Sequence, residues 1–106
     1  MSELYLNSSN FAAEVKGPGL PVMVDFYADW CGPCKMMSPV IEQLAKEYEG
    51  KIKVFKLNVD NAQEIAGQFG VSSIPTVVFF KDGKVIDRFV GALPKANIIN
   101  YIDKYI

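Results

Sequence analysis

Cys31 and Cys34 are the only cysteines of this chain, and two residues separate them in the run Trp30-Cys31-Gly32-Pro33-Cys34-Lys35. Two thiols at positions i and i+3 on one helical turn can close into a small disulfide ring. The pair can then alternate between dithiol and disulfide, which is reversible redox chemistry. A bystander pair and half of a metal site are the alternative interpretations.

The position of the pair indicates which thiol attacks. A hydrophobic run at residues 21–28 leads into Cys31, and a helical pattern follows it. The first turn of a helix presents unpaired N–H groups and a positive dipole end, which stabilise a thiolate. We therefore expect Cys31 to attack, and the more buried Cys34 to resolve the mixed disulfide. Gly32 and Pro33 should keep the helix start rigid, because proline has a fixed φ and lacks an N–H.

Two charged residues interrupt apolar runs. Asp25 precedes Cys31 by six residues, and Lys56 stands in Val54-Phe55-Lys56-Leu57. Burial in an apolar strand penalises the carboxylate form, so we expect a raised pKa for Asp25. We interpret Asp25 as the acceptor of the Cys34 proton, directly or through water. The alternative is a structural ion pair between Asp25 and Lys56, and Lys56 could also be an ordinary snorkelling lysine.

The rest of the pattern predicts the elements that position these residues. Residues 21–28 are apolar on both alternating faces apart from Asp25, which is typical of a central strand in a largely parallel sheet. Apolar residues at helical spacing from Cys31 to about Tyr48 predict a long helix, which Pro39 should kink. Other strands are expected at 4–6, 52–59, 75–80 and 84–90, and a short hairpin-type turn at residues 81–83 should join the last two. Other helices are expected near 11–15, near 62–69 and from Pro94 onward. The expected order is β-α-β-α-β-α-β-β-α, with helices on both faces of a mixed sheet.

Three sets of apolar residues are expected to form the apolar, packing sides of these helices. The sets are Phe11, Ala12 and Val15; Met36 and Met37; and Ile98, Ile99, Ile102 and Ile106.

Composition limits the possible functions. The 106 residues fit one domain, 1–106, and half of them are hydrophobic, so a packed core is expected. A formal net charge of -1 provides no long-range attraction to nucleic acid or to an anionic membrane. Histidine is absent, which excludes Cys-His catalysis and histidine metal ligands. Two cysteines cannot fill a tetrahedral zinc site, although a site shared between two chains stays open.

The compartment is inferred from what the sequence lacks. The first residues have neither the basic region nor the apolar stretch of a signal peptide, and no apolar run has the length of a membrane span. We therefore expect a cytoplasmic protein. In that reducing compartment a close cysteine pair is more often catalytic or metal-binding than structural.

Two further features lie outside the cysteine motif. Trp30 occupies a turn beside the reactive group, which favours a contact surface over a core position. Ile74-Pro75 opens a strand, and its pattern alone does not establish a cis bond.

Together these residues resemble the thioredoxin family over essentially the whole chain. A bare pair of cysteines two residues apart is a weak signal, whereas the full set of motifs in this order is very specific. The matching motifs are Val24-Asp25-Phe26-Tyr27-Ala28-Asp29-Trp30-Cys31-Gly32-Pro33-Cys34-Lys35, Pro39, Lys56-Leu57-Asn58-Val59-Asp60, Ile74-Pro75-Thr76, Phe80-Lys81-Asp82-Gly83 and Val90-Gly91-Ala92.

The resemblance implies an α/β thioredoxin fold, a five-stranded mixed sheet flanked by four helices. It also implies a protein disulfide reductase that acts on disulfide-containing client proteins and is recycled by a thioredoxin reductase. Such a protein needs no bound cofactor or metal, because the Cys31–Cys34 pair carries the electrons. We expect a monomer that binds neither nucleic acid nor membrane.

The family also implies roles for particular residues. Cys31 is the nucleophile, Cys34 the resolving thiol, and Asp25 the buried proton acceptor beside Lys56. An acidic attacking cysteine is a known property of this family, so the resemblance implies it as well. Pro75 is expected in the cis form facing the cysteines, with the Ile74 backbone pairing with an extended client segment. The client groove is expected to consist of Trp30, Gly32, Pro33, Ile74, Pro75, Gly91 and Ala92.

Two residues depart from the usual family pattern, and two other functions are alternatives. Tyr27 stands where many members have a second tryptophan, and Ser73 where glycine is frequent; neither changes the chemistry. An oxidant or isomerase is one alternative, although Gly-Pro between the cysteines resembles the reducing branch. A binding module with dispensable cysteines is the other.

Overall fold

The centre of the structure, a computed structural model that describes residues 4–17 and 19–106, is a five-stranded sheet. Its strands are β1 (Tyr5–Leu6), β2 (Val22–Tyr27), β3 (Lys53–Asn58), β4 (Thr76–Lys81) and β5 (Lys84–Val90). They lie in the order β1-β3-β2-β4-β5, so β2 is central, as its apolar faces predict. β3 pairs in parallel with β1 and β2, whereas β4 is antiparallel to both of its neighbours. The expected mixed sheet is confirmed.

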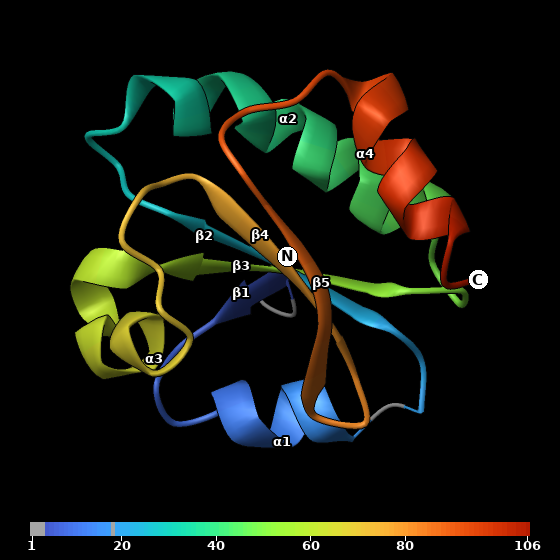
Figure 1. Ribbon diagram of the computed structural model, residues 1–106, viewed down its shortest axis with the longest axis horizontal. Helices are drawn as coiled ribbons and strands as arrows, with labels where there is room; N and C mark the ends of the chain where they lie inside the picture. The colour runs from blue at the N-terminus through green and yellow to red at the C-terminus, as the bar shows by residue number, and fades with distance from the viewer. Residues whose placement is uncertain (1–3, 18) are drawn as a thin grey trace.

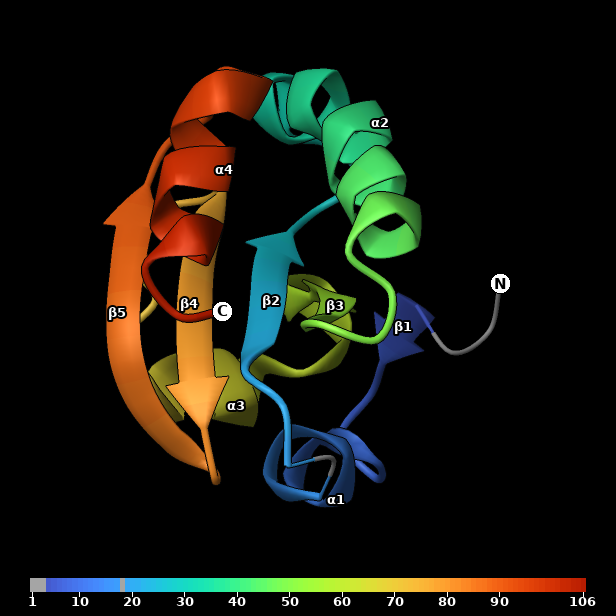
Figure 2. The same ribbon diagram turned by 90° about the vertical axis from the view of Figure 1, so that its right-hand side faces the viewer.

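Helices cover both faces of this sheet, as predicted. They are α1 (Phe11–Lys16), α2 (Gly32–Glu47), α3 (Gln63–Gln68) and α4 (Lys95–Asp103), with a short 3-10 turn, η2 (Val59–Asn61), after β3. Figures 1 and 2 show α2 and α4 on one face and α1 and α3 on the other. Within the described residues, no helix has both the length and the hydrophobicity needed to cross a bilayer.

Alternation along β2 divides its side chains between two hydrophobic cores. Val24 and Phe26 belong to the core shared with α1 and α3, and Met23 belongs to the core beneath α2 and α4. Asp25 has the parity of Met23, so it lies on the α2 side of the sheet. Lys56 is its register partner in β3 and lies on the same side. The sheet therefore places an acid and a base side by side under α2.

α2 begins directly after Cys31, which is its N-cap residue with an extended backbone (φ -89°, ψ 113°). Proline in the first turn suits this start, because its missing N–H would have no helical partner there. Met37 is 2% exposed and packs into the core as predicted, whereas Met36 is 78% exposed. The prediction for Met36 is wrong because one residue along a helix turns the side chain by about 100°.

Two other residues predicted on the apolar side of a helix are exposed. Ala12 is exposed, because Phe11 and Val15 alone form the buried face of the short α1. Ile106 lies beyond the end of α4 and is 50% exposed, whereas Ile98 and Ile102 are fully buried.

The hairpin between β4 and β5 has a two-residue turn. Lys81 pairs with Lys84, and both residues between them have positive φ, 53° at Asp82 and 82° at Gly83. This is the backbone of a type I′ turn, for which Asp-Gly is a preferred sequence. The predicted hairpin is confirmed.

Candidate active site

The two cysteines form a disulfide across the first turn of α2. Their Cα atoms are 5.2 Å apart, within the normal range for a disulfide. The Cys31 sulfur accepts a hydrogen bond of 3.2 Å from the backbone N–H of Cys34. Cys31 is 5% exposed and Cys34 2% exposed. The helix start therefore directs an N–H group at the sulfur of Cys31, which is the arrangement that stabilises a thiolate.

The loop before β4 lies against this sulfur. The Cys31 sulfur is 3.9 Å from the carbonyl oxygen of Ile74, and the Ile74–Pro75 bond is cis, as the family resemblance implies. The Gly91 N–H donates a 2.8 Å hydrogen bond to the Pro75 carbonyl, with Gly91 at a φ of 94°. The end of β5 is thereby fixed beside Pro75, and Ala92 follows as an exposed residue.

Trp30 presents most of its side chain to solvent. It is 70% exposed, and its indole N–H donates a 2.9 Å hydrogen bond to Asp60. Asp60 lies in η2, held by a 2.9 Å hydrogen bond from its own N–H to the side chain of Asn58. This exposed position agrees with the prediction that Trp30 belongs to a contact surface and not to the core. Gly32 and Pro33, which follow in the motif, are also exposed.

The structure thus brings most of the predicted groove together around the disulfide. Ile74 and Gly91 are partly exposed, and Pro75 is buried beside them. On this surface the Ile74 carbonyl oxygen lies next to the sulfur of Cys31.

Asp25 is fully buried, and neither of its carboxylate oxygens has a hydrogen-bond partner among the described residues. Burial raises the pKa of Asp25 from its usual 3.8 to about 7, and the positive charge of Lys56 opposes that rise. The sequence predicted a raised pKa for the same physical reason. A carboxyl group with this pKa can gain or lose a proton near neutral pH.

Lys56 is 3% exposed, yet it does not form the predicted alternative ion pair with Asp25. Its ammonium donates a hydrogen bond to the hydroxyl of Ser38 and lies 3.6 Å from a carboxylate oxygen of Glu42. It also lies 4.8 Å from the centre of the Tyr27 ring. The structural-pair interpretation of Asp25 is therefore wrong, because the long lysine side chain reaches α2 instead.

The spacing of polar residues along α2 could have identified Ser38 and Glu42 as partners of Lys56, but the sequence prediction did not include them. Cys34, Ser38 and Glu42 are spaced at i, i+4 and i+8, so they share one face of α2. When a helix lies over a strand that contains a buried lysine, polar residues on that face of the helix can contact the lysine ammonium.

A cavity of about 340 Å³ opens between this face of α2 and the sheet. It is lined by Tyr5, Tyr27, Ala28, Asp29, Cys34, Lys35, Ser38 and Lys56. The resolving cysteine and the buried lysine therefore border the same space, which is large enough for water. Within the described ranges, no cluster of three or more potential metal ligands exists.

Comparison of the sequence with known proteins identifies a family. The thioredoxin family model matches residues 2–104. The chain is 48% identical to a thioredoxin of Haemophilus influenzae over 107 residues, with both chains fully covered. It is 56% identical to a thioredoxin of Chlorobaculum thiosulfatiphilum over 97 residues, covering 92% of this chain and 90% of the relative. It is 50% identical to the chloroplastic M-type thioredoxin of Pisum sativum, covering 95% of this chain and 59% of the pea protein.

This chain belongs to the thioredoxin family. It is a thiol-disulfide oxidoreductase, and its cysteine pair performs dithiol-disulfide exchange. Reduction of protein disulfides with recycling by a reductase is the general role of thioredoxins.

Proposed function

We propose that this thioredoxin-family protein reduces client disulfides in two steps, with Cys31 as nucleophile, Cys34 as resolving thiol and Asp25 as proton acceptor. In the first step the Cys31 thiolate attacks a client disulfide. A Cys31–client disulfide forms, the client S–S bond breaks, and one client sulfur leaves as a thiolate that takes up a proton.

In the second step Cys34 loses its proton to Asp25 and attacks the Cys31 sulfur. The Cys31–Cys34 disulfide forms, the mixed disulfide breaks, and the second client sulfur leaves and is protonated. The client gains two electrons, and the protein becomes oxidised. No bound cofactor enters this cycle, because exchange with a thioredoxin reductase returns the electrons and completes electron transport.

The observation that carries the proposal is the placement of the disulfide on the first turn of α2, with an N–H directed at Cys31. The Cys31 sulfur accepts from the Cys34 N–H, which favours Cys31 as the stabilised thiolate. Asp25 supports the second step, since it is buried on the α2 side of the sheet and its carboxylate has no hydrogen-bond partner in the described part of the chain. Cys34 lines a cavity together with Lys56, the register neighbour of Asp25, and this cavity is large enough for a water that would carry the proton between them. Lys56 is the register neighbour of Asp25, and its positive charge opposes the rise in the pKa of Asp25.

We propose that clients bind across the surface around the disulfide. This surface consists of Trp30, Gly32, Pro33, Ile74, Pro75, Gly91 and Ala92. The Ile74 carbonyl, close to the Cys31 sulfur, would accept a backbone hydrogen bond from an extended client segment.

The decisive test is a disulfide-reduction assay with insulin, a thioredoxin reductase and NADPH. Cys31→Ser should abolish turnover, whereas Cys34→Ser should accumulate the mixed disulfide, visible as a covalent adduct on non-reducing gels. Asp25→Asn should slow the resolving step at pH 7 by about tenfold to hundredfold, because a general base is lost. Asp29→Asn, at an exposed neighbour, is the matched control. An unchanged resolving rate and pH profile in Asp25→Asn would remove Asp25 from the mechanism.

We also propose that the protein works as a monomer in the cytoplasm, as a reducing pair suits a reducing compartment. Light scattering at micromolar concentration and fractionation of cells that produce the tagged protein test this. A stable dimer, or recovery from an oxidising compartment, would contradict it.

A further inference from the structure

Lys56 is a buried base whose contacts come from α2 and from two aromatic rings. Its ammonium donates to Ser38, lies 3.6 Å from Glu42, and lies 5.4 Å and 4.8 Å from the ring centres of Tyr5 and Tyr27. Two rings, a hydroxyl and a carboxylate therefore share one ammonium, with favourable cation-π geometry at both rings. The ammonium has a defined position in the cavity wall.

The Lys56 ammonium forms no ion pair with Asp25, its neighbour in the sheet. The two residues are paired in register between β2 and β3, on the same side of the sheet. An ion pair would be the simplest way to satisfy a buried carboxylate. Among the described residues, however, both Asp25 oxygens lack a partner, and the carboxylate paired with Lys56 is that of Glu42.

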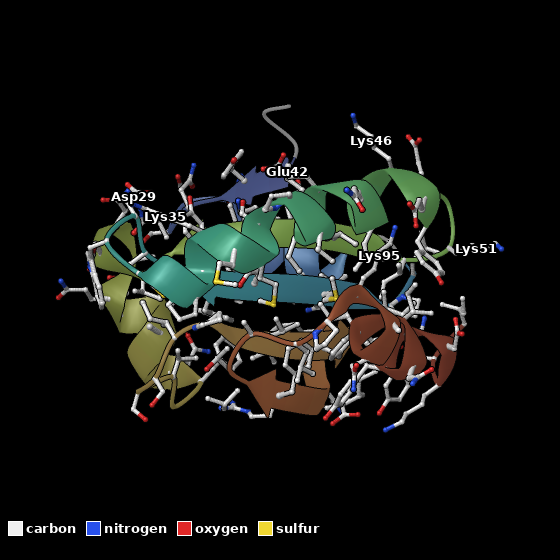
Figure 3. The ribbon with its side chains drawn as sticks, turned by 90° about the horizontal axis from the view of Figure 1, so that it is seen from above. Asp29, Lys35, Glu42, Lys46, Lys51 and Lys95 are labelled. Carbon is white, nitrogen blue, oxygen red and sulfur yellow. A yellow bond between two sulfur atoms is a disulfide. The ribbon has the colours of Figure 1, made fainter. Side chains whose placement is uncertain are left out.

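The anchors of the lysine come from the helix that carries the cysteines. Ser38 follows Cys34 by one turn and Glu42 follows by two, on the same face of α2. Figure 3 shows Glu42 along α2, on the side away from α4. The helix therefore supplies both the thiol that must lose a proton and the groups that hold the lysine.

We propose that Ser38 and Glu42 are positioning residues that hold the Lys56 ammonium on the α2 side and off the Asp25 carboxylate. This inference rests on the proposed role of Asp25 as acceptor of the Cys34 proton. A carboxylate paired with an ammonium stays ionised and is a weak base. Held apart from it, Asp25 takes up protons near neutral pH, where Cys34 must release one.

Other charged or titratable groups also face this cavity, and they remain constant across the variants below. They are Tyr5 from β1, Tyr27 from β2, Asp29 from the following loop, and Cys34 and Lys35 from α2. Of the residues that the structure describes, only Ser38 and Glu42 form a hydrogen bond or an ion pair with the ammonium. Their replacement changes the position of the lysine while the rest of the cavity is kept.

The first experiment follows the titration of Asp25 by carboxyl ¹³C NMR in the oxidised protein. Ser38→Ala and Glu42→Gln should each lower the Asp25 midpoint by about half a pH unit, because the released ammonium approaches the carboxylate. Ser38→Thr keeps a hydroxyl and should restore the wild-type midpoint. Glu47→Gln is the matched control: it removes an exposed glutamate of the same helix that pairs with Lys95 instead. Its midpoint should stay unchanged.

A double-mutant cycle separates positioning from the direct field of Glu42. In a Lys56→Met background, Ser38→Ala and Glu42→Gln should no longer move the Asp25 midpoint. Equal effects with and without Lys56 would overturn the proposal, as would a midpoint that rises in Ser38→Ala. A shift in Glu47→Gln as large as that in Glu42→Gln would overturn it too.

The same variants distinguish this proposal from the mechanism on which it rests. Stopped-flow measurement of the resolving step should show its pH midpoint falling by the same amount as the NMR midpoint. If the NMR midpoint moves while Asp25→Asn leaves the resolving rate unchanged, the positioning is correct and the catalytic role of Asp25 is wrong. If Asp25→Asn slows resolution while Ser38→Ala and Glu42→Gln move neither midpoint, the positioning is wrong and the catalytic role stands.

Discussion

Replacing Asp25 by asparagine should remove a large pH dependence of stability. The pKa of Asp25 is 3.8 in an unstructured chain and about 7 in the folded protein, because burial penalises its charge. The folded state therefore binds this proton more tightly than the unfolded state does. The stability that this tighter proton binding by Asp25 contributes is fully present below pH 4, and it is lost as pH rises from about 4 to about 7.

The magnitude follows from the difference between the two pKa values. A span from 3.8 to about 7, at about 1.36 kcal/mol for each pH unit, corresponds to about 4 kcal/mol. This is a large fraction of the stability of a small domain, which is about 5–15 kcal/mol. An asparagine at position 25 has no proton to lose, so its free energy of unfolding should lack this decline. Relative to wild type, Asp25→Asn should gain about 4 kcal/mol between pH 4 and pH 8.

The assay is equilibrium unfolding in guanidinium chloride at pH 4, 5, 6, 7 and 8, with the disulfide kept oxidised so that the thiols do not titrate. The quantity to follow is the difference between the wild-type and variant free energies of unfolding, because other titrating groups cancel in it. Asp29→Asn, an exposed residue four positions away, should run parallel to wild type. If Asp25→Asn also runs parallel to wild type across this range, the raised pKa and the argument from burial are refuted.

Two further predictions concern the scaffold. Ile41→Ala, at a fully buried position of α2, should lower the free energy of unfolding by about 2–5 kcal/mol, measured by denaturant titration, since it leaves a cavity in the core. A loss below about 1 kcal/mol would contradict the packing of α2 on the sheet. Gly83→Ala should cost about 1 kcal/mol in the same measurement, because a residue with a Cβ is disfavoured at a φ of 82°; no loss would contradict the I′ turn.

Most of the fold could be predicted because its signals are local. Apolar residues on both faces of residues 21–28 identified the central strand, and Lys81-Asp82-Gly83 identified the hairpin turn. The errors have local causes as well. Met36 is one residue out of phase with the buried face of α2, and Ile106 lies beyond the end of α4. The position of β1 at an edge beside β3 depends on contacts between distant segments, which the expected element order does not state.

In the candidate site, too, features set by neighbouring residues could be predicted, whereas features set by contacts between distant segments could not. The N-cap position of Cys31 and the burial of Asp25 followed from the residues around each of them. The partners of Lys56 did not, because they depend on where α2 crosses β3 and on how far a lysine side chain reaches. Two opposite charges in adjacent strands suggested an ion pair. The helix packed above them supplies the polar groups that the ammonium contacts.

The effect of Asp25 on the stability of the protein and its proposed role as proton acceptor have one physical origin. An ion pair with Lys56 would lower the pKa of Asp25 and remove much of the stability loss expected above pH 4. It would also leave a carboxylate that does not accept a proton near neutral pH. With the ammonium directed to Ser38 and Glu42, the folded protein retains a buried group that titrates at about 7. The loss of stability on ionisation and the capacity to take a proton from Cys34 should therefore change together whenever the partners of Lys56 are altered.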